Sequence, residues 1–186
     1  MKHLFILLSV LFFVFSASEA QNTNIASKEK KTFSIVIHGG AGSMNPESMS
    51  KARQEAYHAK LREALSVGEK LLEQGETAVN TVEAVINVME NSPLFNAGKG
   101  AVFTSRGTCE LDASIMDGKT LNAGAVAGVT RIKNPVSGAK LVMQKSKHVM
   151  LAGKGADQFA GQNGLDLVKN KYFQTKKRKK SLERAQ

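Results

Sequence analysis

The residues of this sequence whose types and spacing suggest chemistry lie in glycine-rich segments. Residues 33–42 read FSIVIHGGAG and carry His38, Gly39 and Gly40 directly after an apolar run. Residues 93–103 read PLFNAGKGAVF and place Asn96 in a loop after a predicted helix. An asparagine amide can hydrogen-bond to a reacting group.

A third segment, residues 110–118, reads ELDASIMDG and contains two aspartates, Asp112 and Asp117. Asp112 alternates with apolar residues along a predicted strand, and Asp117 precedes Gly118 in a strong turn signal. We interpret Asp117 as a turn residue and Asp112 as a hydrogen-bonding residue of the strand. Neither is expected to be a catalytic carboxylate.

Other motifs do not predict a site. Gly118-Lys119-Thr120 has Ala113 where a phosphate-binding loop needs glycine, and it lies in a hairpin turn. The histidines His38, His58 and His148 lack the spacing of zinc ligands. Cys109 is the single cysteine, so the fold does not rely on an intrachain disulfide. We expect Cys109 to be a small buried residue.

The elements that must position these segments follow from hydrophobic periodicity. The sequence predicts a buried strand at 34–37, a helix over 50–74 that ends at Gly75, and a second helix capped by Thr77. Strands are expected near 111–115 and 123–129 as an antiparallel meander. A helix is expected from Asn134-Pro135 to about Lys145, and a short one through Ala160. This order favours an α+β fold, with helices layered on an antiparallel sheet.

The two ends of the chain differ from its middle. Residues 1–20 have a basic start, an apolar stretch and a Ser-Glu-Ala cleavage site, which is typical of a signal peptide and predicts export to a periplasm or secretion. Residues 21–31 are expected to be a polar linker. The net charge of +10 is concentrated in residues 169–186, predicted to be a basic flexible tail, whereas residues 32–168 carry 14 basic and 13 acidic side chains. The folded part is therefore not a basic nucleic-acid-binding surface, and no nucleic acid is expected as a partner.

The glycine-rich segments, in this order and spacing, resemble the α-subunit region of plant-type L-asparaginases, also called isoaspartyl peptidases. The resemblance runs from about Ile35 to Phe173 and includes PLFNAG, ELDASIMDG, residues 124–128 (GAVAG), Asn134-Pro135 and residues 146–150 (SKHVM). It implies the N-terminal part of an αββα sandwich of the N-terminal nucleophile (Ntn) hydrolases. It also implies a precursor that cuts itself between a glycine and a threonine. The new N-terminal threonine then attacks the amide of L-asparagine or of a β-aspartyl peptide.

The resemblance assigns supporting roles to residues of this chain. It implies a structural sodium ion, and no organic cofactor, held by the main-chain carbonyls of Met89, Glu90, Ser92, Phe95, Ala97 and Lys99. Asn96 is expected to face the active site, or alternatively to hold its own turn. His38, Gly39 and Gly40 resemble a loop beside the bond that is cut; alternatively, the glycines permit close backbone packing.

The nucleophile itself is not found in these 186 residues. Gly107-Thr108 lies in a polar turn and does not match the expected junction, so the nucleophile is expected beyond Gln186, in a β-subunit made from the same precursor. Residues 32–168 would then be the α-subunit region, inactive alone, and residues 169–186 would precede the cleavage site. A dimer of αβ pairs is implied. Two alternatives stay open: a glycosylasparaginase-type amidohydrolase, and a non-catalytic truncated remnant whose basic tail binds polyanions.

Overall fold

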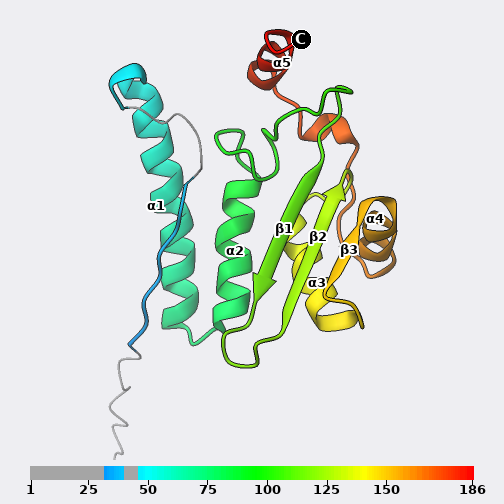
Figure 1. Cartoon of the computed structure of the whole chain (residues 1–186). Helices are drawn as coiled ribbons and strands as arrows, with labels where there is room; N and C mark the ends of the chain where they lie inside the picture. Colours follow the sequence, from blue (N-terminus) through cyan, green and yellow to red (C-terminus); the bar gives the residue numbers. More distant parts are fainter. Residues whose placement is uncertain (1–31, 40–45) are drawn as a thin grey trace, which may run out of the picture. The chain divides into compact units, whose positions relative to one another are not determined.

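The computed structural model describes residues 32–39 and 46–186, which fall in one compact unit from Lys31 to Gln186. The expected signal peptide, the linker over 21–31 and Gly40 lie outside the described residues. Within the described ranges, no helix is long and apolar enough to cross a bilayer. The elements are arranged as shown in Figure 1. In chain order they are η1 (Pro46–Ser48), α1 (Lys51–Glu73), α2 (Ala78–Glu90), β1 (Leu111–Met116), β2 (Ala123–Val129), α3 (Pro135–Lys145), β3 (Met150–Ala152), α4 (Gly153–Gln162), η2 (Asn170–Tyr172) and α5 (Lys176–Glu183).

The two long helices form an antiparallel hairpin, as Figure 1 shows. The hydroxyls of Ser50 and Thr77 cap the first turns of α1 and α2 by accepting main-chain N–H groups. Between the helices, Gly75 has φ 85°, a left-handed conformation that favours glycine and ends α1. The predicted bounds of the first helix and the predicted Thr77 cap of the second are therefore confirmed.

Within the described residues, the sheet has three strands in the order β1-β2-β3. β1 and β2 pair antiparallel, with Ser114 opposite Ala125, and β2 and β3 pair parallel, with Ala125 opposite Met150. The expectation of a wholly antiparallel sheet is wrong for β3. Helix α3 connects β2 to β3 and brings the chain back to the edge of the sheet where β2 begins, so β3 runs in the same direction as β2.

One face of the sheet is covered by helices and the other is open. On the covered face, Gly124 lies so close to α3 that an added Cβ would collide with the Ala139 carbonyl oxygen and the Met143 nitrogen. Val126 and Val129 on the same strand pack with Ala156 and Ala160 of α4. The opposite face looks toward the viewer in Figure 1, and no described element covers it. Its residues are small or flexible: Asp112, Ser114, Met116, Ala125, Ala127 and Met150.

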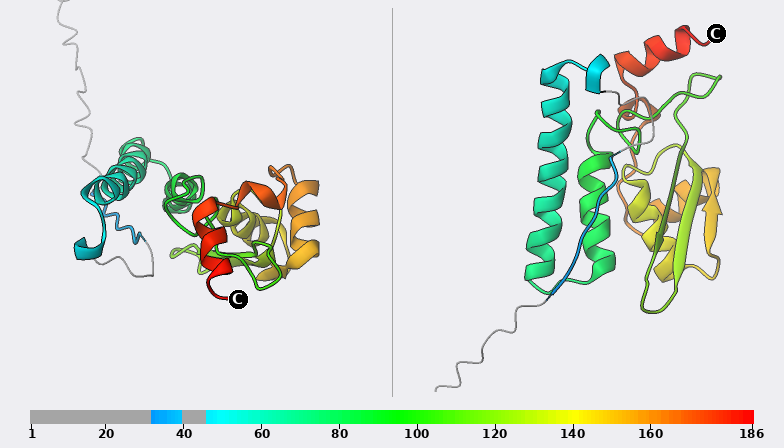
Figure 2. Two further views of the ribbon diagram at one scale, coloured as in Figure 1. Left: turned by 90° about the horizontal axis from the view of Figure 1, so that it is seen from above. Right: turned by 60° about the vertical axis from the view of Figure 1, so that its left-hand side comes forward.

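Residues 32–39 are extended but form no strand, so the strand predicted at 34–37 is wrong. This segment runs alongside α1 in both views of Figure 2, and its isoleucines pack in one cluster with residues of α1 and α2. Ile35 occupies a notch that Gly68 of α1 leaves open, whereas Val36 is 92% exposed. The alternating pattern is therefore that of a strand with one buried face. A ladder also needs a neighbouring strand, and the described chain places none beside it.

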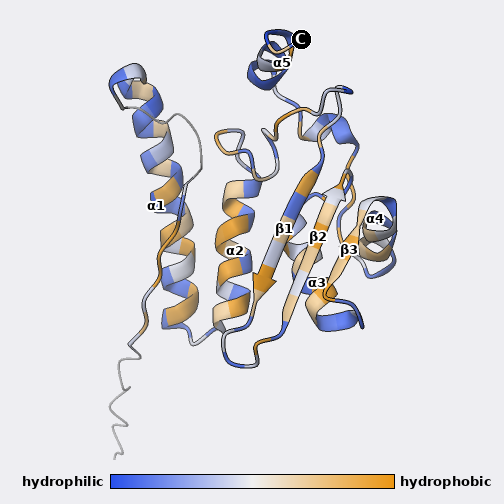
Figure 3. Cartoon of the chain, in the orientation of Figure 1, coloured by the Kyte–Doolittle hydropathy of each residue, from blue (hydrophilic) through white to orange (hydrophobic). Residues whose placement is uncertain are grey.

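Residues 169–186, expected to be a flexible tail, contain η2 and α5. The sequence of α5 is almost entirely hydrophilic, as Figure 3 shows, which is why its composition indicated a linker. The signal for order lies before the basic run. The Asn170 amide donates to the main-chain oxygens of Cys109 and Thr130 and its oxygen accepts the Cys109 N–H, while Phe173 is fully buried.

Candidate functional site

The loop that follows α2 closes on itself through main-chain hydrogen bonds. The Lys99 N–H donates to the Glu90 oxygen at 2.7 Å, and the Ala101 N–H donates to the Gly98 oxygen at 3.0 Å. Two glycines permit this closure. A Cβ at Gly98 would lie 2.5 Å from the Glu90 oxygen, and one at Gly100, where φ is +104°, would lie 2.6 Å from the Phe95 oxygen. The glycines of NAGKG are therefore required because carbonyl groups approach the backbone closely.

The carbonyls expected to hold sodium fall into two groups. Those of Met89 and Glu90 accept main-chain hydrogen bonds, from Ser92 and Lys99 respectively. Those of Ser92, Phe95, Ala97 and Lys99 accept no hydrogen bond from any described residue. A carbonyl has two lone pairs, so the first group can still coordinate a cation, and the second has both lone pairs available. Uncharged oxygens on a tightly turned loop fit a hard monovalent cation. Separately, the described ranges hold no cluster of acidic, histidine or cysteine side chains of the kind that binds divalent metals.

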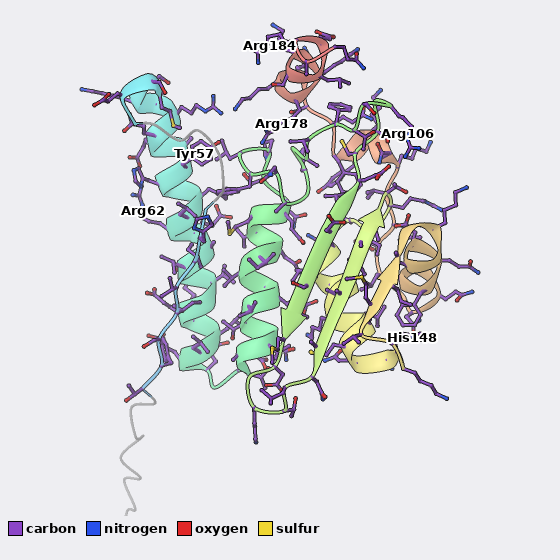
Figure 4. The ribbon with its side chains drawn as sticks, in the orientation of Figure 1. Tyr57, Arg62, Arg106, His148, Arg178 and Arg184 are labelled. Atoms are coloured by element: carbon purple, nitrogen blue, oxygen red, sulfur yellow. The ribbon has the colours of Figure 1, made fainter. Side chains whose placement is uncertain are left out.

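Aromatic side chains of α1 and of the loop itself hold the loop in place. Tyr57 of α1 lies beside the loop in Figure 4, and its hydroxyl donates to the Leu94 oxygen at 2.8 Å. The Tyr57 and Phe95 rings meet edge to face, with centroids 5.7 Å apart, and Phe95 is 4% exposed. This contact holds Leu94 and Phe95, the residues before Asn96, against the α1–α2 hairpin.

Glu90 is a buried acid that joins the loop to α3. Its carboxylate accepts the Val136 N–H at 2.8 Å and the Asn134 side-chain amide at 3.0 Å. Burial raises the pKa of the Glu90 carboxyl from its ordinary value of 4.5 to about 7, although both hydrogen bonds act in the opposite direction. Asn134 occupies the cap position before α3, but its side chain makes no capping hydrogen bond. The acid from the end of α2 caps α3 instead.

The structure places the other expected site residues around the same region. The side chain of Asn96 is exposed and makes no hydrogen bond with a described residue, so it does not hold its turn through any described partner. His38 is exposed, and a Cβ at Gly39 would lie 3.0 Å from Leu61, which packs in the cluster of Tyr57 and Phe95. Gly39 and the Asn96 loop therefore border one hydrophobic cluster. Gly40 lies outside the described residues.

The carboxylates set aside from the sequence have structural roles. Asp117 accepts hydrogen bonds from the Lys119 N–H and the Thr120 hydroxyl, which hold its pKa below the ordinary value, and it is a turn residue as predicted. Asp112 is exposed, and its Oδ1 accepts the Gly128 N–H at 2.7 Å. Cys109 is fully buried, and burial raises the pKa of its thiol.

The side-chain roles of two buried acids, Glu90 and Asp157, were not predicted from the sequence. Glu90 was considered only for its main-chain carbonyl. Asp157 of α4 is 4% exposed and accepts hydrogen bonds from three successive main-chain N–H groups, those of Thr130, Arg131 and Ile132, and from the Thr130 hydroxyl. No local pattern indicates either role, because their partners are between 25 and 46 residues away.

Comparison with known proteins shows the family of this chain. Residues 31–186 match the asparaginase family. The chain belongs to this family. It is 47% identical over 148 residues to the isoaspartyl peptidase of Escherichia coli strain K12, covering 80% of this chain and 46% of that protein. It is 42% identical over 150 residues to the isoaspartyl peptidase/L-asparaginase of Homo sapiens, covering 81% and 47%. This asparaginase-family chain thus spans about half the length of the curated relatives that it matches.

Proposed function

We propose that this chain is the α-part of a hydrolase that acts on L-asparagine and on β-aspartyl peptides. The observation that carries the proposal is the match of residues 31–186 to the asparaginase family, together with relatives named isoaspartyl peptidase at 42% to 47% identity. The nucleophile is a threonine that self-cleavage places at the N-terminus of a β-part, and αβ pairs assemble as dimers. This chain supplies no nucleophile, so alone it is expected to be inactive.

In the proposed reaction, the threonine hydroxyl oxygen attacks the side-chain carbonyl carbon of the substrate, and the threonine α-amino group takes the hydroxyl proton. That proton passes to the leaving nitrogen, which departs as ammonia or as the amine of the peptide, and an ester remains on the threonine. Water then hydrolyses the ester to release aspartate. An exposed, unengaged amide suits Asn96 for a hydrogen bond near the threonine. His38, Gly39 and Gly40 border the bond that is cut during maturation.

The open face of the sheet is where we propose that the β-part packs. Its central residues are small, Ser114, Ala125 and Ala127, while Met116 and Met150 are more than half exposed. Small side chains let a second sheet approach at the spacing of a sandwich, which is ~10 Å. The result would be the αββα arrangement, with α3 and α4 as one outer layer.

The proposal is tested by producing the chain alone and as a precursor that continues into the β-part. The precursor should cleave itself and release aspartate from L-asparagine and from a β-aspartyl dipeptide, whereas the chain alone should do neither. Replacing the nucleophilic threonine of the β-part by alanine is the control. A correctly cleaved, assembled pair that hydrolyses neither substrate would contradict the proposal. Preference for sugar-linked asparagine would favour the glycosylasparaginase alternative.

We also propose that the loop binds sodium through the carbonyls named above and that the ion stabilises the loop. The unengaged carbonyls of Ser92, Phe95, Ala97 and Lys99 support this. Thermal unfolding in sodium chloride should then occur at a higher temperature than in choline chloride at the same ionic strength. Equal midpoints in the two salts would exclude the site.

A second candidate function rests on the basic segment. Residues 169–184 carry eight basic side chains and one acid, and none of the basic groups forms a salt bridge with a described residue. Such a cluster can retain a polyanion. Replacing Lys176, Lys177, Lys179 and Lys180 by glutamine should abolish heparin retention at physiological salt if this function is real. Unchanged retention would count against it.

Export is the remaining proposal, because the apolar stretch and Ser-Glu-Ala site of residues 1–20 are typical of a signal peptide. Mass spectrometry of protein made in a secreting host should find a mature N-terminus near Gln21. An intact Met1 in the exported fraction would contradict cleavage.

A further inference from the structure

The C-terminal segment engages Gly100 on both sides of its backbone. The Gly100 N–H donates to the Phe173 main-chain oxygen at 2.7 Å, and the Gly100 oxygen accepts the Arg178 Nε–H at 2.9 Å. Gly100 lies between the expected ion-binding carbonyls and the start of the sheet region. A glycine at φ +104° has wide conformational freedom by itself, so these two bonds define its orientation.

The first of these bonds also orients Lys99. The carbonyl of Lys99 and the N–H of Gly100 belong to one planar trans peptide, so they point in opposite directions. Because the N–H points to Phe173, the Lys99 carbonyl must point away from the C-terminal segment. This carbonyl accepts no hydrogen bond from a described residue. The next peptide is fixed in the same way, with its oxygen on Arg178 and its N–H, that of Ala101, on Gly98.

The C-terminal segment is itself anchored well enough to act as a support. Phe173 is fully buried in the core beneath the sheet, beside Val129 and Ile132. Arg178 lies in the first turn of α5, where the Thr175 hydroxyl accepts its main-chain N–H. The labelled side chain of Arg178 in Figure 4 lies below the helix, toward the green loop. The segment is therefore anchored on both sides of its contact with Gly100, by Phe173 in the core and by the capped first turn of α5.

We propose that residues 173–178 position the loop 96–101. The Phe173 main-chain oxygen orients the peptide that carries the Lys99 carbonyl, and the Arg178 side chain is the positioning residue that holds the next peptide through the Gly100 carbonyl. The chain after α4 would thus be a structural part of the loop rather than a tether. Its influence on sodium binding rests on the ion site proposed above. Its influence on the loop conformation rests only on the bonds to Gly100.

The first test compares two substitutions in the full-length protein, Arg178→Met and Lys179→Met. Each removes one positive charge and all side-chain donors from the same turn of α5, but Lys179 is exposed and its side chain makes no hydrogen bond with a described residue. Amide hydrogen exchange is measured across residues 96–101. Arg178→Met should speed exchange at Gly100 and Ala101 by roughly tenfold, the effect of losing one charge-assisted bond, and Lys179→Met should not. Equal exchange in the two variants would overturn the proposal.

The second test measures the sodium dependence of thermal unfolding in the same variants, with choline chloride as the control salt. Arg178→Met should weaken the apparent sodium affinity up to roughly tenfold, and Lys179→Met should leave it unchanged. Faster exchange with unaltered sodium affinity would overturn the assignment of the Lys99 carbonyl. A wild-type protein without any sodium response would refute the ion site instead, and the exchange result alone would then decide the role of Arg178. Circular dichroism at 222 nm, compared between the variants, shows that both retain their helices.

Discussion

Replacing Glu90 by glutamine should change how the stability of the protein depends on pH. The carboxylate is 1% exposed and accepts hydrogen bonds from Val136 and Asn134, at the N-terminus of α3. These donors and the helix N-terminus favour the ionised form, whereas burial favours the protonated form. Burial dominates, and the pKa is raised from 4.5 to about 7. Glutamine keeps the shape and one accepting oxygen but cannot ionise.

The direction follows from the folded pKa lying above the unfolded one. Between pH 4.5 and 7 the folded state binds more protons than the unfolded state, so stability falls as pH rises through this window. The contribution of the carboxyl is fully present below pH 4.5 and is lost above pH 7. A shift of this size corresponds to about 3 kcal/mol, at ~1.4 kcal/mol for each pKa unit. Glu90→Gln should therefore gain up to about 3 kcal/mol on the wild type between pH 4.5 and pH 8.

Urea unfolding of both proteins at pH 4.5, 6, 7 and 8 measures this difference. Only the change of the difference with pH matters, because every other titrating group is shared by the two proteins. The glutamine amide also meets the Asn134 amide, and that constant cost cancels in the comparison. A difference that stays flat across this range would refute the reasoning, since it would mean that the donors from α3 hold the charge despite burial.

Three further substitutions are predicted from contacts, each followed by urea or thermal unfolding. Asp157→Ala should lower the free energy of unfolding by about 3–5 kcal/mol, because three main-chain N–H groups lose their acceptor. Gln158→Ala, at the exposed neighbouring position, should change it little. A loss below ~1 kcal/mol for Asp157→Ala would contradict this role. Thr81→Val should stabilise the protein by about 1 kcal/mol, because the buried Thr81 hydroxyl has no partner among the described residues. Thr77→Val should instead destabilise it, because α2 loses its cap. Changes in stability of the same sign for both variants would be inconsistent with these contacts. Leu121→Gly should stabilise by about 1 kcal/mol, because Leu121 is 69% exposed and adopts φ 61°, and a lower melting temperature than the wild type would speak against strain there.

The candidate site was predictable in part, because some of its features depend on neighbouring residues and others depend on contacts far along the chain. The glycines of residues 96–100 indicated a tightly closed loop, because few other residues tolerate such close backbone contacts. The acid that joins this loop to α3 was not predictable. Glu90 looks like an ordinary residue of the last helical turn, and its burial depends on Val136, 46 residues later.

Local patterns also misjudged elements whose structure depends on distant partners. Residues 34–37 have the short apolar, β-branched run of a buried strand, but a strand exists only where another strand pairs with it. Residues 176–183 have the composition of a linker, but a buried Phe173 and the Gly100 carbonyl hold them in place.

The sequence by itself determined the long helices, their caps, the β1–β2 hairpin and the family, because these depend on neighbours a few residues apart or on motifs in a fixed order. Only the tertiary structure decided the direction of β3, the elevated pKa of Glu90 and the hydrogen bonds of Phe173 and Arg178 to Gly100. The burial of one polar side chain and the choice of a pairing partner are decided when segments far apart in the chain meet, and neither leaves a local pattern in the sequence.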